Sequence, residues 1–530
     1  MKIKVLDCTL RDGGYVNNWE FKKNNLFKIS KANIDANIDF LELGFLQNVD
    51  FNEDRTLYPS IEYVYSLYKD FDFKNTAPVL MITFSKSEDL VIPKNEHNDL
   101  YIRIIFKKNE KDEALKYCSK IKSLGYKIFI NPTHTYDYSD LEFLELINEV
   151  NEIRPFGFSI VDTNGIFSTE TLLNYVSLAD RNLNEDTVIG VHCHNNLQLA
   201  FANAVSLKNY DSKRTCVVDV SMLGMGRGAG NLNSELFLSY YNSFSAYKYD
   251  TFSVLNCIND VIEPIKQKND WGYNLSFYLS SIHKCHPNYA KFLLSKQNLS
   301  SEEISKIFDL IPLKMKSNYD LACIESLYEN FVQNHIDDAK ALEKLSSELS
   351  NYNVVILGPG SSLKTEQDKI SKFIADNESS KVFGINFIPS NFKVDYAFFS
   401  NSKRYESYLQ SGNGNGNCRF VTTSNLKSDN ELNIDFSSCL SDSEYGDSSL
   451  LLLLNLLKRI KVKNVFLAGC DGYSKDSSNF KYVEGFLGHS YERDIMDKLA
   501  YNKGVSKILS FYAKDMNIQF LTSTNYKIAK

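Results

Sequence analysis

Two histidines and an aspartate carry the sharpest chemical signal in this sequence. His192 and His194 stand two residues apart in the β-prone run Val191-His192-Cys193-His194, and alternate residues of a strand point to the same face. Asp12 follows another β-prone segment. Two nitrogen ligands and one oxygen ligand suit a divalent transition ion and leave coordination positions for a substrate. We therefore predict a metal site at Asp12, His192 and His194, with two buried, hydrogen-bonded histidines as the alternative.

Polar residues near these ligands add further chemistry. Arg11 stays charged at any working pH and can bind an enolate or carboxylate oxygen bidentately. Glu42 is a candidate partner for Arg11 in a structural ion pair, and both roles can hold at once. The glycine-rich run Gly224–Gly230, followed by Asn231, allows the backbone to approach a ligand closely.

These residues lie at the ends of short apolar segments that alternate with helix-length stretches. The predicted strands are Lys4–Thr9, Phe40–Phe45, Val79–Phe84, Tyr101–Phe106, Lys127–Asn131, Gly157–Asp162, Val188–His194 and Thr215–Leu223. Several are apolar on both faces, as buried parallel strands are. Strands that each precede a helix most simply close into a (β/α)8 TIM barrel, where chemistry sits at the strand ends. An open doubly wound sheet is the structural alternative.

The remainder of the chain divides into two further regions. The strand signal is lost between about 240 and 345, and alternation restarts at Asn353. The predicted strands beyond it are Val354–Leu357, Lys381–Ile385, Tyr396–Ser400, Arg419–Thr423, Asn464–Gly469 and Gln519–Thr522. The predicted long helices are Leu450–Ile460 and Tyr491–Met516. We predict a barrel over 1–240, a helical extension or connector over 241–350, and an open, doubly wound Rossmann-like α/β domain over 351–530. The Ser/Gly/Asn-rich stretch 411–417 predicts a loop.

Composition excludes several classes of protein. The 530 residues are 43% hydrophobic and 24% charged, as in globular proteins. The longest aliphatic run, Leu450–Leu454, is far shorter than the roughly 20 residues of a membrane span, and the charged N-terminus is unlike a signal peptide. We therefore predict a cytoplasmic protein. The net charge of -7 argues against a nucleic-acid partner, and His283, Cys285 and His286 lack the second ligand cluster of a zinc finger.

Taken together, four separated motifs resemble the DRE-TIM metallolyase (HMG-CoA lyase-like) superfamily. They are Leu10-Arg11-Asp12-Gly13, the segment with Glu42, His192-Cys193-His194-Asn195, and the glycine-rich run that ends at Asn231. Within this group, residues 1–240 are most similar to the 4-hydroxy-2-oxovalerate aldolase-like branch. The resemblance implies a bond made or broken between carbons next to a 2-oxo acid, with an aldehyde as the second substrate.

The same resemblance implies roles for individual residues. Asp12, His192 and His194 correspond to metal ligands, and the Asn that matches Asn231 also binds the metal in some members. Mn2+ is the expected ion, with Mg2+, Co2+ and Zn2+ as alternatives. Arg11 corresponds to the residue that stabilises a pyruvate-like enolate, and Glu42 to the one that orients the site.

One position departs from the aldolase pattern. Those enzymes carry a catalytic histidine two residues after the Gly of the first motif, and this chain has Tyr15 there. A tyrosine has an unperturbed pKa near ~10, so Tyr15 needs strong activation to act as a base. Alternatively, Tyr15 donates a hydrogen bond and His134 carries the proton. The departure leaves the acceptor open, and a sugar-derived or amino-sugar aldehyde fits equally well.

A second constellation begins the C-terminal region. Gly358, Gly360, Ser361 and Ser362 lie between a predicted strand and a helix, where backbone N–H groups favour phosphate. A tight structural turn is an equal alternative, because the Walker A and full Rossmann fingerprints are absent. Asp471 follows another predicted strand and could enter the same crevice. This region weakly resembles 6-hydroxymethylpterin-pyrophosphokinase-like proteins and small sialyltransferases, which implies a nucleotide or nucleotide sugar.

The sequence thus favours a metal-dependent aldolase fused to a nucleotide- or phosphate-binding, transferase-like domain. Domain pairing suggests surface-carbohydrate synthesis, and we expect a homo-oligomer. One rival is a Claisen-type synthase that joins a 2-oxo acid to an acyl-CoA. A second places the activity in the C-terminal domain, with the barrel as a regulatory part. A third is a metal-free binding module.

Overall fold

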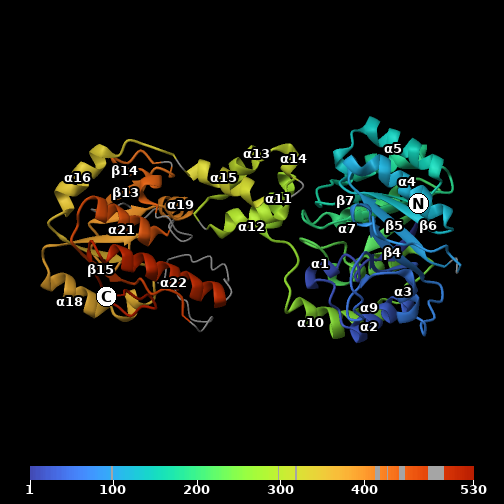
Figure 1. The fold of residues 1–530 in the computed structure, drawn as a ribbon, viewed down its shortest axis with the longest axis horizontal. Coiled ribbons are helices and arrows are strands. Elements are labelled where there is room, and N and C mark those ends of the chain that lie inside the picture. Colours follow the sequence, from blue (N-terminus) through green and yellow to red (C-terminus); the bar gives the residue numbers. More distant parts are fainter. Residues whose placement is uncertain are drawn as a thin grey trace. The chain divides into compact units, whose positions relative to one another are not determined.

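The computed structural model describes residues 1–529 except 97–98, 297, 317–318, 333, 412–417, 427, 441–447 and 475–494. The chain forms two compact units, Met1–Pro287 and Asn288–Lys530, which are drawn in Figure 1. The boundary between them falls inside the predicted helical connector. The predicted loop at 411–417 lies, except for Ser411, outside the described residues.

Eight parallel strands close into a barrel in the first unit. They are β1 (Lys2–Asp7), β2 (Phe40–Leu46), β4 (Ala77–Thr83), β5 (Tyr101–Phe106), β6 (Lys127–Pro132), β7 (Gly157–Asp162), β8 (Val188–Cys193) and β9 (Thr215–Val220). Each strand pairs with the next, and β1 pairs with both β2 and β9, which closes the ring. The short β3 (Leu57–Tyr58) pairs beside β2. The TIM-barrel prediction is confirmed, and the open-sheet alternative is excluded for this unit.

Helices follow the strands and cover the barrel (Figure 1). They are α1 (Gly14–Asn17), α2 (Lys23–Asp35), α3 (Ile61–Leu67), α4 (Lys111–Ser123), α5 (Asp140–Ile153), α6 (Thr169–Asn182), α7 (Ala200–Asn209), α8 (Ser234–Phe244), α9 (Thr251–Cys257), α10 (Glu263–Lys266) and α11 (Leu275–Ile282). In α5 the buried residues Phe143, Leu146 and Val150 recur at helical spacing. Its first turn is closed by Ser139 and Glu142, each of which accepts a backbone N–H of the other.

Inside the barrel, an apolar layer is followed by a charged one. Phe40, Tyr101, Phe129 and Val217 belong to one buried cluster. Two positions further along the same strands come four buried polar residues, Glu42, Arg103, Asn131 and Asp219. Because residues two apart on a strand share a face, this second layer also points inward. The strands therefore carry charge toward their carboxyl ends.

The second unit contains an open, wholly parallel sheet. Its strands are β10 (Asn353–Leu357), β11 (Ser380–Ile385), β12 (Tyr396–Phe399), β13 (Arg419–Thr423), β14 (Leu432–Ile434), β15 (Asn464–Ala468) and β16 (Asn517–Phe520). Their order is β14-β13-β12-β11-β10-β15-β16. The order reverses at β10, which pairs with both β11 and β15, as at the switch point of doubly wound folds. The predicted Rossmann-like architecture is confirmed.

The helices of this unit include several from the region that was predicted to be a helical connector. They are α12 (Pro287–Ser295), α13 (Ser301–Leu310), α14 (Leu313–Lys316), α15 (Leu321–Val332), α16 (Ala339–Leu349), α17 (Ser362–Thr365), α18 (Gln367–Asp376), α19 (Ser402–Gln410), α20 (Phe436–Cys439), α21 (Ser449–Arg459) and α22 (Ile495–Tyr512). Residues 491–494 of the predicted last helix lie outside the described part of the chain. Among the described residues, no helix combines the length and apolar character needed to cross a bilayer.

Candidate metal centre and active site

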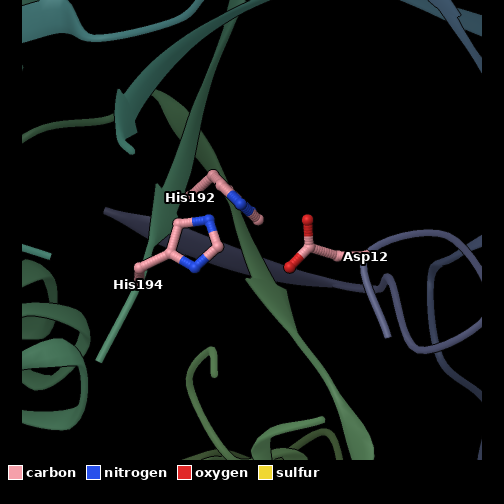
Figure 2. Close-up of side chains that lie close together, drawn as sticks. All are labelled: Asp12, His192 and His194. Atoms are coloured by element: carbon pink, nitrogen blue, oxygen red, sulfur yellow. The ribbon is translucent and has the colours of Figure 1, made fainter. Parts of the chain in front are cut away.

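The three predicted metal ligands converge at the carboxyl end of the barrel. Asp12 lies in the turn between β1 and α1, His192 in β8 and His194 directly after it. Figure 2 shows the carboxylate facing the two imidazoles. One ligand atom from each residue lies within 4.8 Å of the others, and all three side chains are buried. This is the arrangement that a divalent cation needs, so the donor set fits such an ion.

Asn231 completes this group with an oxygen of its own. Its Nδ2 donates to Asp12 Oδ2 at 2.6 Å, whereas its Oδ1 is buried without a hydrogen-bond partner among the described residues. An unsatisfied buried acceptor costs about 1–3 kcal/mol, and a cation would remove that cost. Gly226 packs against the same two side chains: a Cβ there would lie 2.2 Å from Asn231 Nδ2 and 2.7 Å from Asp12 Oδ2.

A chain of buried ion pairs orients the ligands. Asp219 Oδ2 lies 2.9 Å from His192 Nδ1 and accepts from Arg103 Nη2 at 2.7 Å. Arg103 Nη1 reaches Glu42 at 3.4 Å, and Glu42 accepts from Arg11 Nε at 2.7 Å. With its Nδ1 hydrogen held by Asp219, His192 presents Nε2 to a metal. Sequence reasoning missed Arg103 and Asp219, although each is a charged residue inside an otherwise apolar strand.

Arg11 is buried and bonded to both of its predicted neighbours. Besides the Glu42 contact, its Nη1 donates to Asp12 Oδ1 at 2.5 Å. The predicted ion pair with Glu42 is thus present. Together with Arg103 and Asp219, these linked side chains carry one excess negative charge. A divalent cation reverses that sign and makes the site attractive to an anion.

Burial and charge set the protonation states of two candidate ligands. Burial by itself favours protonation of Asp12, but Arg11 and the nearby imidazoles hold the pKa of this carboxyl well below its usual range. Burial lowers the pKa of His194 to about 4. Asp12 is therefore ionised and His194 neutral at physiological pH, the forms that coordinate metals.

The two candidate proton carriers differ in their surroundings. Although Tyr15 is 43% exposed as a residue, desolvation of its hydroxyl, followed by the negative charge of Asp12, raises its pKa, so its phenol stays protonated and can donate. Burial, followed by the positive charge of Arg227, lowers the pKa of His134 to about 4. His134 follows β6 in a left-handed conformation, and its backbone N donates to Thr163 Oγ1 at 2.8 Å. At neutral pH its imidazole is an acceptor of protons.

In the second unit the predicted phosphate loop meets the predicted aspartate. Asp471 Oδ2 accepts from the backbone N of Ser362 at 2.9 Å and from Ser361 Oγ at 3.3 Å, and Ser362 Oγ bonds to Oδ1. A Cβ on Gly360 would lie 2.4 Å from Asp471 Cγ. Here the protein's own carboxylate uses the donors that a phosphate needs. Binding of a nucleotide by Gly358, Gly360, Ser361, Ser362 and Asp471 stays a prediction.

Comparison with known proteins places the barrel in a family. Residues 2–241 match the HMGL-like family. A 4-hydroxy-2-oxovalerate aldolase from Geobacillus genomosp. 3 is 23% identical over 272 residues, covering 50% of this chain and 77% of the relative. A homocitrate synthase from Pyrococcus abyssi is 24% identical over 314 residues, covering 54% and 82%. The solved HMG-CoA lyase of Bacillus subtilis is 15% identical with a TM-score of 0.38, covering 50% of this chain and 93% of that one. Residues 2–241 of this chain are an HMGL-like domain.

Proposed function

We propose that the barrel unit is a divalent-metal-dependent aldolase that makes or breaks a carbon–carbon bond next to a 2-oxo acid of the pyruvate type, with Mn2+ as its ion. One observation carries the proposal: the ligand set of Asp12, His192 and His194 lies beside the buried guanidinium of Arg11. Similarity to 4-hydroxy-2-oxovalerate aldolases supports it.

The site must stabilise the negative charge that develops on the 2-oxo acid during the reaction. When the bond breaks, its electron pair passes to the 2-oxo acid and leaves an enolate oxygen. A bound divalent cation supplies Lewis-acid stabilisation of that oxygen. Arg11 supplies a second positive group: its Nε and Nη1 are held by Glu42 and Asp12, and its Nη2 makes no bond to the described residues. Held in advance, this donor needs no reorganisation during the reaction.

His134 and Tyr15 have the two remaining roles, proton transfer and hydrogen-bond donation. The neutral imidazole of His134 accepts the proton of the hydroxyl that becomes the aldehyde, and returns it in the synthetic direction. Tyr15 keeps its proton and donates a hydrogen bond. The raised pKa of Tyr15 and the lowered pKa of His134 support this assignment.

The test follows the methyl protons of pyruvate. The Mn2+-loaded protein is incubated with pyruvate in D2O, and exchange is measured by NMR. We expect exchange in the wild type and its loss in Arg11→Ala and in His192→Ala. Arg181→Ala, which removes an exposed guanidinium from the last turn of α6, serves as the matched control. Absence of exchange with every 2-oxo acid would overturn the proposal.

A Claisen-type synthase is the second candidate, because a homocitrate synthase is also among the relatives. The two reactions differ in the acceptor. A synthase consumes an acyl-CoA and releases the free thiol of CoA, whereas an aldolase does not. Release of CoA from acetyl-CoA and a 2-oxo acid, followed with a thiol reagent, would favour the synthase.

For the second unit we infer a nucleotide- or phosphate-binding role at the carboxyl ends of β10 and β15. The switch point of the sheet supports it. Asp471 must release the loop before a phosphate can bind there. Calorimetric titration of the full chain with ADP and with UDP-glucose tests the role. Saturable binding, abolished by Gly360→Val, is the expected result, and no binding of either nucleotide would contradict it.

A further inference from the structure

Arg227 stands apart from the other arginines of the barrel mouth. Arg11 and Arg103 are each paired with carboxylates. Arg227 is half-buried, and no carboxylate among the described residues pairs with it. Its hydrogen bond runs instead from Nη2 to Nε2 of His286 at 2.6 Å. A guanidinium has only donors, so His286 accepts here. The remaining donors of Arg227 have no protein acceptor in the described chain.

The glycine-rich loop holds this guanidinium close to the metal centre. Gly226, the preceding residue, abuts Asp12 and Asn231. The positive charge of Arg227 acts on His134 after β6 and on His194 after β8, and in both cases it lowers the pKa. It also acts on Tyr15 after β1. The charge of Arg227 therefore acts on both candidate proton carriers and on a candidate metal ligand.

A charge in this position needs a partner. A guanidinium that is partly withdrawn from water and has no carboxylate partner is stabilised when an anion pairs with it. The planar fork of an arginine matches a carboxylate or a phosphate bidentately. The contact with His286 uses one N–H of Nη2. The second N–H of Nη2, with Nη1 or Nε on the same edge, is left for such an anion.

We propose that Arg227, oriented by His286, binds an anionic group on the aldehyde substrate and so selects acceptors that carry a carboxylate or a phosphate. This rests on the proposed aldolase function. The 2-oxo acid is served by the ligand set and by Arg11, which bonds to Oδ1 of Asp12, whereas Gly226, next to Arg227, packs against Oδ2. The charge of Arg227 acts instead on His134, the group that handles the proton of the aldehyde oxygen. The second substrate is thus the one within its reach.

The experiment compares matched aldehydes in the Mn2+-loaded full chain with pyruvate. Glyceraldehyde 3-phosphate is set against glyceraldehyde, and succinic semialdehyde against butanal. We expect kcat/KM for the charged member of at least one pair to exceed that for the neutral member by roughly 10- to 100-fold. The pair that shows the preference identifies the anion as phosphate or carboxylate.

Three variants locate the preference. Arg227→Gln should reduce the ratio to about one, chiefly by raising KM for the charged aldehyde. Arg227→Lys keeps the positive charge but lacks the two-donor edge of a guanidinium, so it should retain part of the preference for the charged aldehyde. Arg181→Gln is the control and should keep the full ratio. A wild-type ratio near one for both pairs, or an Arg227→Gln variant that slows charged and neutral aldehydes equally, overturns the inference.

A readout without turnover separates this inference from the proposed function. Glycerol 3-phosphate, succinate and glycerol are titrated into the Mn2+-loaded protein by calorimetry. We expect one of the anions to bind, glycerol not to bind, and Arg227→Gln to weaken the anion at least ten-fold. If the anion binds as expected but pyruvate shows no methyl-proton exchange, the result counts against the aldolase function and not against the role of Arg227. Anion binding that is unchanged in Arg227→Gln would count against Arg227.

Discussion

Asp219 shows how a side chain outside the candidate ligand set can orient one of its members. It contacts His192 on one side and Arg103 on the other. Through the first contact it sets the tautomer of the imidazole, and through the second it keeps its own negative charge. The positive charge of Arg103, followed by hydrogen bonding to His192, helps to hold the pKa of Asp219 below its usual value despite burial.

Replacing Asp219 by Asn should therefore weaken metal binding. The isosteric amide keeps the shape but no longer fixes the Nδ1 hydrogen of His192 with a full charge. We expect the affinity for Mn2+ to fall by about 10- to 100-fold, measured by calorimetry. Asp211→Asn, at an exposed carboxylate before β9, should leave the affinity unchanged. An unaltered affinity in Asp219→Asn would contradict the proposed orienting role.

The lowered pKa of His134 predicts a dependence of stability on pH. An unfolded histidine has a pKa near 6.5, whereas His134 in the fold has one of about 4. Because the unfolded chain binds the proton more tightly, the contribution of neutral His134 is fully present above pH 6.5. This stability is lost as the pH falls toward 4, and the loss at pH 5 amounts to about 1–2 kcal/mol.

Urea unfolding at pH 7.5 and pH 5 checks this expectation. The wild type should lose more stability between the two pH values than His134→Asn, which has no imidazole to protonate. His335→Asn removes a histidine whose side chain is 70% exposed and should behave like the wild type. Equal losses in the wild type and His134→Asn would show that His134 titrates normally.

At the scale of elements, the loops after the strands differ in how they satisfy their polar groups. In the barrel, the glycine-rich loop after β9 brings Asn231 to Asp12 but leaves Asn231 Oδ1 without a hydrogen bond in the described structure. In the second sheet, the turn after β10 is satisfied by Asp471 from the loop after β15. The first loop is prepared for a ligand, and the second is closed on itself.

Removal of the Asp471 side chain should therefore destabilise the second unit. Asp471→Ala takes away the acceptor of the Ser362 backbone N and of two hydroxyls. We expect a loss of about 1–2 kcal/mol, the usual effect of losing a helix cap, in unfolding followed by far-UV circular dichroism. Asp368→Asn, at an exposed position of α18, is the control and should have little effect. No change in Asp471→Ala would show that the turn does not depend on this carboxylate.

At the scale of the whole molecule, the unfolding of the two units can be followed separately. The chain contains two tryptophans, Trp19 and Trp271, and both belong to the barrel unit. Trp19 Nε1 donates to the backbone O of Arg11 at 2.9 Å, and Trp271 Nε1 donates to Leu223 at 3.1 Å. Tryptophan emission thus follows the barrel, and follows it near the proposed metal centre.

Metal should stabilise one unit and not the other. A ligand at 100 times its Kd adds about 2.7 kcal/mol to the stability of the fold that binds it. We expect saturating Mg2+ or Mn2+ to raise the midpoint of unfolding seen by tryptophan emission. The part of the circular dichroism change that lies outside this transition comes from the second unit, and its midpoint should stay the same. His194→Ala should abolish the shift, and a shift that persists in this variant would place the metal elsewhere.

The sequence by itself predicted the strands, their alternation with helices and the candidate ligand set, whose three members the fold brings together. Strand periodicity and paired histidines are local patterns, so β5 and β7 begin and end at the predicted residues. The same local reasoning brought Asp12 and Arg11 into the site, because side chains after parallel strands share one end of a barrel.

Only the tertiary structure decided which charges meet. Arg103 and Asp219 are 116 residues apart in the chain, and Asn231 and Asp12 are 219 apart. Such partners depend on the closure of the ring and on the stagger between strands, which no local pattern encodes. For the same reason the sequence could not show that Asp471 fills the turn after β10, or that Arg227 lacks a carboxylate among the described residues. A side chain's type is written in the sequence, but the free energy of its charge depends on neighbours that folding brings together.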